Sequence, residues 1–98
     1  MHEVDEKFYD RADAHIHLSN DQITEETGRG MVSASFMYAV ARFNAWVSAC
    51  GFRNSGQMRQ AKAETIDYFM AEYRKMLEEN LDDYISNFDS YMEISNET

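Results

Sequence analysis

Two histidines one residue apart, within the stretch DAHIHL at residues 13–18, raise the question of metal chemistry. On a β-strand such a pair lies on one side and can bind the catalytic ion of an amidohydrolase barrel, but that fold needs roughly 250 residues. This chain has 98 residues. On a helix the two side chains lie about 200° apart. We therefore interpret His15 as a core or boundary residue and His17 as solvent-exposed, and we predict no catalytic metal site.

Other acidic groups offer little further chemistry. Asp13 and Asp21 lie one helical turn on either side of His17, and adventitious binding of a divalent ion by these three is the alternative to a solvated face. The run at residues 78–83 holds four carboxylates but lacks the glycine and the alternating ligands of an EF-hand loop. We interpret this run as a solvated face or as half of an ion-paired interface. We expect no catalytic residue and no cofactor.

Basic residues gather around the turn before the third predicted helix. Residues 31–63 contain no acidic residue. Because the backbone N–H groups at a helix start attract anions, Arg53, Arg59 and Lys62 are candidates for binding a phosphate or carboxylate. In the alternative interpretation these cations pair with the protein's own acids. The net charge of -9 disfavours general binding to nucleic acid or to an anionic membrane.

Composition predicts a single all-helical domain over residues 1–98. A hydrophobic content of 44% suffices for one core, and the absence of proline disfavours a sheet built on tight turns. We find no export signal at the amino terminus and no transmembrane helix, because Arg42 and Asn44 interrupt the most apolar segment. The single cysteine, Cys50, is predicted to be a buried, unreactive thiol, which fits a reducing cytoplasm.

Apolar residues recur at helical spacing in three segments. They predict helices over residues 4–26, 33–50 and 57–92, in an up-down-up arrangement with a long carboxyl-terminal helix. We expect the glycines of the turn at residues 28–30 to end the first helix in a left-handed conformation, and Ser33 to be the N-cap of the second. The second helix is apolar on more than one side, which is typical of a central helix.

The third predicted helix carries the sharpest pattern in the chain. Its spacings average about 3.67 residues per turn, so that the side chains stay on one face of a nearly straight helix. We interpret the first half as the core stripe of a bundle. In the alternative, the helix breaks near Asn80 and a short fourth helix folds back. The repeating residues are Ile66, Met70, Tyr73, Leu77, Leu81, Tyr84, Phe88 and Met92.

This third helix is also the longest, at roughly 54 Å against about 35 and 27 Å for the other two. Its distal part would therefore lack a partner inside a three-helix bundle, and large apolar stripes are rarely left in water. Unless the helix folds back, we expect the surface to pair with another chain, most simply in a two-fold homodimer. The predicted interface residues are Leu77, Leu81, Tyr84, Ile85, Phe88 and Met92.

Four stretches, at residues 8–13, 32–39, 41–45 and 73–85, together resemble a family of small bacterial proteins classified only as a domain of unknown function. The similarity covers about residues 4–92. The resemblance implies a stand-alone bacterial protein and brings no reaction, ligand or catalytic residue with it.

Two classes of function follow from the sequence. The first is a non-enzymatic, cytoplasmic and homodimeric helical interaction protein, whose surface of aromatic residues and adaptable methionines binds a protein partner. The alternative is a small-anion or metabolite-binding protein that uses Arg53, Arg59 and Lys62.

Overall fold

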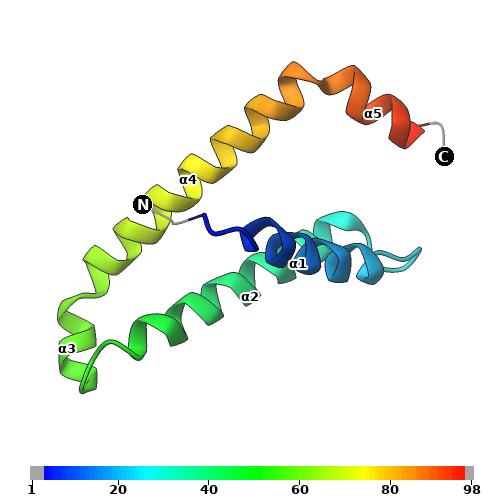
Figure 1. Ribbon diagram of the computed structural model, residues 1–98. Coiled ribbons are helices and arrows are strands. Elements are labelled where there is room, and N and C mark those ends of the chain that lie inside the picture. Colours follow the sequence, from blue (N-terminus) through cyan, green and yellow to red (C-terminus); the bar gives the residue numbers. More distant parts are fainter. Residues whose placement is uncertain (1–3, 97–98) are drawn as a thin grey trace. The chain divides into compact units, whose positions relative to one another are not determined.

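The computed structural model describes residues 4–96, with side chains described as far as Met92. The described residues form five helices and no strand, so the all-α prediction is confirmed (Figure 1). The chain divides into two units, one ending at Arg59 and the other beginning at Gln60. The up-down-up order of the long helices stays a prediction. Among the described residues, no helix combines the length and apolar character that a membrane span requires.

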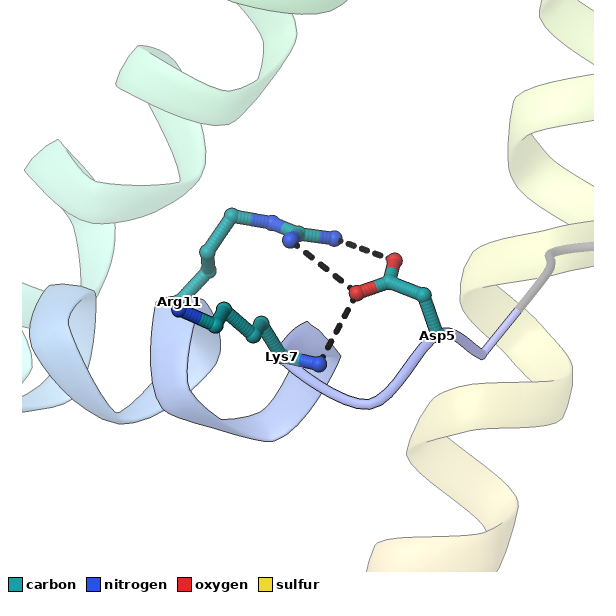
Figure 2. Close-up of polar contacts among 3 residues, drawn as sticks. All are labelled: Asp5, Lys7 and Arg11. Carbon is teal, nitrogen blue, oxygen red and sulfur yellow. Dashed lines mark hydrogen bonds and ion pairs between the residues drawn. The ribbon is translucent and has the colours of Figure 1, made fainter.

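The first unit begins with α1 (Phe8–Gln22), which is shorter at both ends than the predicted helix over residues 4–26. Its start is organised by Asp5, as Figure 2 shows. The Asp5 carboxylate accepts a hydrogen bond from the Lys7 backbone N–H at 2.9 Å and two from the Arg11 guanidinium at 3.2 and 2.8 Å. The hydrogen bonds from Arg11 lower the pKa of the Asp5 carboxyl. These contacts hold the residues before Phe8 in a turn instead of a helix.

A pair of threonines, and not a glycine, turns the chain after α1. Ile23 has an extended backbone, with φ −77° and ψ 122°. The Thr24 N–H then donates to the Thr27 carbonyl at 2.9 Å, and the Thr27 N–H donates back to Thr24 Oγ1 at 3.1 Å. No described glycine has a positive φ. The predicted closure by a left-handed glycine is therefore wrong.

The second helix, α2 (Arg29–Ala49), begins before the predicted N-cap. Gly28 holds the N-cap position with an extended backbone, whereas Ser33 lies inside the helix, so that prediction is wrong. The helix ends where expected, with Cys50 as its C-cap. Cys50 is exposed. The prediction of a buried thiol is therefore wrong.

Helices α1 and α2 contact each other and form a helical hairpin (Figure 1). The His15 and Phe36 rings lie 6.3 Å apart, centroid to centroid, and His15 is exposed, so it is not a core residue. Val32 is 4% exposed and is the one buried hydrophobic residue in the described part of the chain. Phe43 and Val47 of α2 are exposed. Within this unit α2 has only the shorter α1 as a neighbouring long helix, and its central position in the domain stays a prediction.

The segment predicted as one helix over residues 57–92 is divided into three. A short helix, α3 (Ser55–Gln60), is followed by the long α4 (Lys62–Ser86) and then by α5 (Phe88–Asn96). The prediction of one unbroken helix to residue 92 is therefore wrong. In the second unit α5 contacts α4 and leaves it at an angle (Figure 1).

The second break lies at Asn87, and the predicted alternative near Asn80 is wrong. Asn80 lies inside α4, where its Nδ2 donates to the Met76 carbonyl at 2.8 Å. Asn87 departs from helical geometry, with φ −119° and ψ 23°. Its Nδ2 donates to the backbone carbonyl of Asp83 and to its carboxylate Oδ1, both at 3.0 Å. Asn80 makes the same kind of bond to backbone without interrupting α4, so the additional bond to the Asp83 carboxylate is what distinguishes Asn87.

Candidate functional site

An apolar stripe runs along α4 and is exposed over its whole length. At about 100° per residue, its members lie within about 80° of one another around the helix. Each is between 41% and 66% exposed, and the first half, predicted as a bundle core, is as open as the second. We call this set the α4 stripe: Ile66, Met70, Tyr73, Leu77, Leu81 and Tyr84.

An adjoining face of the same helix is much less accessible. Phe69 and Met76 are half-buried, and Glu72 is buried at 6% exposure. The Glu72 carboxylate accepts a hydrogen bond from Lys75 Nζ at 3.1 Å, which lowers the pKa of Glu72. Exposure is therefore not common to all apolar residues of α4. The α4 stripe is a separate surface from the one that is already enclosed.

The face of α4 opposite the stripe is charged and faces water. Glu64 in its first turn and Lys75 near its middle are examples. Arg74 Nε lies 3.7 Å from Glu78 Oε1, one turn along the helix, and both side chains are mostly exposed. The four carboxylates of the acidic run at residues 78–83 are all exposed. Exposed ion pairs of this kind contribute little free energy, so the stripe is the more informative side of α4.

The remaining residues of the predicted interface lie beside the stripe or beyond its end. Ile85 is 73% exposed and lies on α4. Phe88 is exposed and is the first residue of α5, whereas Met92 in α5 is half-buried. The interruption at Asn87 therefore separates Phe88 and Met92 from the helix that carries the stripe.

A small polar cluster shapes the corner between α4 and α5. The Tyr91 hydroxyl donates to Asp83 Oδ2 at 3.0 Å, beside the bonds from Asn87, and the Tyr84 and Tyr91 rings lie 4.8 Å apart. The hydrogen bond to Asp83 raises the pKa of the Tyr91 hydroxyl. The sequence analysis missed this cluster. The signal was available, because Asp83, Asn87 and Tyr91 are spaced by four residues and so share one helix face.

A second exposed aromatic surface lies on α2. The Phe43 and Trp46 rings are 5.6 Å apart and tilted by 42°. No functional role was predicted for these residues from the sequence. The only signal was that α2 is apolar on more than one side. The surface is a shallow hollow lined by Tyr38, Ala39, Arg42, Phe43, Ala45 and Trp46.

The residues of the predicted anion site are divided between the two units. Arg53 and Arg59 belong to the first unit, and Lys62 is the first residue of α4 in the second. The Gln57 N–H donates to Asn54 Oδ1 at 2.9 Å, and the Arg53 N–H donates to Gln57 Oε1 at 2.8 Å. Backbone N–H groups that were expected to meet an anion thus have partners within the turn. The anion site stays a prediction.

The histidines do not build a metal site in the described part of the chain. No group of three or more His, Cys, Asp or Glu residues between residues 4 and 96 is arranged to hold an ion. His17, Asp13 and Asp21 are all exposed on α1 and form no such group.

Comparison with known proteins agrees with the resemblance drawn from the sequence. The profile of the family described as "Protein of unknown function (DUF3144)" matches residues 8–85. The chain belongs to this family. The NMR structure of the protein NB7890A from Shewanella sp. is similar to this chain, with a TM-score of 0.77 and 44% sequence identity over 93% of this chain and 96% of that chain. The search of curated proteins gave no match.

The DUF3144 match ends at Ile85 and therefore includes the whole α4 stripe. It leaves α5, with Phe88 and Met92, outside the matched region. The family description assigns no reaction or ligand. The function of this DUF3144 protein is therefore to be sought in its exposed surfaces, of which the α4 stripe is the most regular.

Proposed function

We propose that this DUF3144 protein is a cytoplasmic helical interaction protein without enzymatic activity, and that it binds protein through the α4 stripe. Ile85 and Phe88 extend the binding surface, and Met92 lies at its far end. The simplest partner is a second copy of the chain, because most oligomers of soluble proteins are symmetric homo-oligomers. A location in the cytoplasm is consistent with a single cysteine, which cannot form an internal disulfide.

One observation carries the proposal, namely the continuous exposure of the α4 stripe. Large aromatic side chains bury 150–250 Å² when fully enclosed, so a half-exposed one still presents about 100 Å² to water. The two tyrosines of the stripe and its four aliphatic side chains, which are exposed to a similar extent, together form a patch of roughly 600 Å², at the upper end of what monomeric proteins expose. Burying this patch against another protein removes the unfavourable contact with water.

Light scattering coupled to size exclusion tests the homodimer directly. We expect a mass of twice 11.4 kDa, together with a thermal unfolding midpoint that rises with protein concentration between about 1 and 100 µM. The midpoint rises because a ligand that binds only the folded state, here the second chain, stabilises that state by mass action. A constant monomer mass with a concentration-independent midpoint contradicts the homodimer.

Binding of a small anion at Arg53, Arg59 and Lys62 is a second candidate. One observation favours it: in the described part of the chain, none of these three cations is engaged by a carboxylate. We expect inorganic phosphate to raise the thermal unfolding midpoint of the parent protein and to lose this effect in the double variant Arg53→Ala, Arg59→Ala. The absence of any shift in the parent protein rules out this candidate for phosphate.

A further inference from the structure

We infer that the α4 stripe binds the same helix of a second copy in antiparallel orientation, with the two-fold axis passing at Leu77. The inference rests on the proposed function, because it names the partner and the register for the same surface. Three properties of α4 support it: the order of its apolar spacings, the distribution of its charges and the area it exposes.

The spacings of the apolar residues read the same in both directions. Within α4, from Met70 to Tyr84, they are three, four, four and three, and Leu77 is the central position. In a two-fold interface, residue i of one chain contacts j of the other and j contacts i. A two-fold axis at Leu77 therefore sets Tyr73 against Leu81 of the second copy, and Met70 against Tyr84. Each aromatic ring meets an aliphatic side chain, and Leu77 meets itself.

The charges of α4 favour the antiparallel orientation over the parallel one. The segment Lys62–Lys75 has three basic and three acidic residues, which gives a net charge of zero. The segment Met76–Ser86 has four acidic residues and no basic one, which gives a net charge of −4. A parallel pair sets −4 beside −4, whereas an antiparallel pair sets each −4 beside a neutral segment. Like charges side by side across an interface are unfavourable, and antiparallel helix dipoles attract.

The exposed area matches what a stable dimer needs. With Ile85 and Phe88 added, the α4 stripe presents roughly 800 Å² per chain, which is the share of one partner in a standard interface of about 1,600 Å². Contact from Ile66 to Tyr84 extends over about 27 Å at 1.5 Å per residue. An average spacing near 3.67 residues per turn keeps the stripe straight along this distance, so two straight helices remain in contact throughout.

Disulfide trapping tests the register in a Cys50→Ser background, because the native Cys50 is exposed. Facing Cα atoms of packed helices come within about 5–6 Å, which a disulfide can bridge. When Tyr73→Cys chains are mixed with Leu81→Cys chains, we expect a disulfide between the two variants. We expect neither variant alone to form a disulfide-linked dimer. In the antiparallel pair, two copies of residue 73 are separated by about 12 Å along the axis, which is too far. Mass spectrometry of the oxidised mixture distinguishes the three products.

The outcomes separate this inference from the proposed function. A dimeric parent protein whose Tyr73→Cys and Leu81→Cys variants form only disulfides with themselves is parallel, which overturns the register but leaves the homodimer intact. A dimer that is trapped neither by this pair nor by Met70→Cys with Tyr84→Cys excludes the α4 register altogether. A monomeric parent protein overturns both proposals, and the stripe is then covered within one chain. Circular dichroism of each variant establishes that it is folded, and the second pair serves where the first fails to fold.

Discussion

The two longest helices distribute their apolar residues in different ways. Helix α2 has 21 residues with two arginines and no acidic residue, so apolar side chains lie on several of its sides. Helix α4 has 25 residues, ten of them charged, and its exposed apolar residues are concentrated in the α4 stripe. A helix that is apolar all round needs several neighbours, whereas a helix with one stripe needs a single partner surface. The proposed interface therefore lies on α4, whose apolar surface is confined to one stripe, and not on α2, whose apolar side chains are spread over several sides.

A charge placed on the stripe provides the strongest test of this difference. We expect Leu77→Glu to weaken dimerisation at least about 100-fold, because the glutamate would be buried beside its own copy at the centre of the interface. Sedimentation or light scattering over a dilution series measures the shift in the dissociation constant.

Two matched variants sharpen the result. Ala71→Glu adds the same charge to an exposed position on the polar side of α4, and we expect no change in the dissociation constant. Phe43→Glu adds it to the aromatic hollow of α2, and we again expect the dimer to persist. If Phe43→Glu raises the dissociation constant as much as Leu77→Glu does, then α2 takes part in the interface. The assignment of the interface to α4 alone is then wrong.

A second prediction concerns the small enclosed part of the α1–α2 hairpin. Val32 is 4% exposed and Val40, on the same helix, is 43% exposed. We expect Val32→Ala to lower the free energy of unfolding by about 2 kcal/mol, since it removes two buried methyl groups and leaves a cavity. Val40→Ala should cost less than about 1 kcal/mol. Urea unfolding of the two variants measures the difference, and equal losses would show that Val32 does not anchor the hairpin.

Periodic features could be predicted from the sequence, and local interruptions could not. The all-helical fold and the α4 stripe follow from the spacing of Ile66, Met70, Tyr73 and their repeats, because periodicity reports which side chains share a face. Helix ends depend on single side chains that bond to nearby backbone, such as Asp5 before α1 and Thr24 after it. These contacts have no periodic signature, so the predicted ends of α1 and the start of α2 were wrong.

The break in the third predicted helix shows the same limit more closely. Asn80 and Asn87 are the same residue type, and both bond to the carbonyl four residues earlier. Only Asn87 also bonds the Asp83 carboxylate, which the Tyr91 hydroxyl engages as well. The interruption lies where these side chains act together, and the conformational preference of a single asparagine does not reveal such a combination. For the same reason, the pattern identified the stripe but not how much of it is exposed, since exposure depends on tertiary neighbours.

A third prediction tests whether Asn87 itself separates α4 from α5. We expect Asn87→Ala to extend α4 into α5, because alanine has the higher helix propensity and lacks the side chain that bonds to Asp83. The change in stability should stay below about 1 kcal/mol. Helical 13Cα chemical shifts through residue 87 would show the extension, and the matched variant Asn80→Ala should leave the break in place. A residue 87 that remains non-helical in Asn87→Ala means that other contacts impose the corner.

The smallest predicted effects distinguish the two units by pH. The pKa of Asp5 is lowered in the fold, so its contribution to stability is present above the ordinary value of 3.8 and is lost as the pH falls through the lowered value. The α1 start should therefore loosen only in acid. The variant Asp5→Asn, which cannot carry the charge, should lose this acid dependence. Helical 13Cα shifts of the first turn of α1 follow the transition, and a turn that opens equally in both proteins excludes Asp5 as its cause.

The corner between α4 and α5 should respond in the opposite direction. The pKa of Tyr91 is raised above its ordinary value of 10.0 by the hydrogen bond to Asp83, so the neutral hydroxyl is the form that the folded corner favours. Its contribution is present below pH 10.0 and is lost as the pH rises through the raised value. Tyr91→Phe should lack this alkaline transition in the 13Cα shifts of α5 and leave α1 unchanged. Asp5 stays ionised over this alkaline range, so its own titration cannot change α1 there. A loss of α1 structure in the same range would therefore show that the two units do not respond independently.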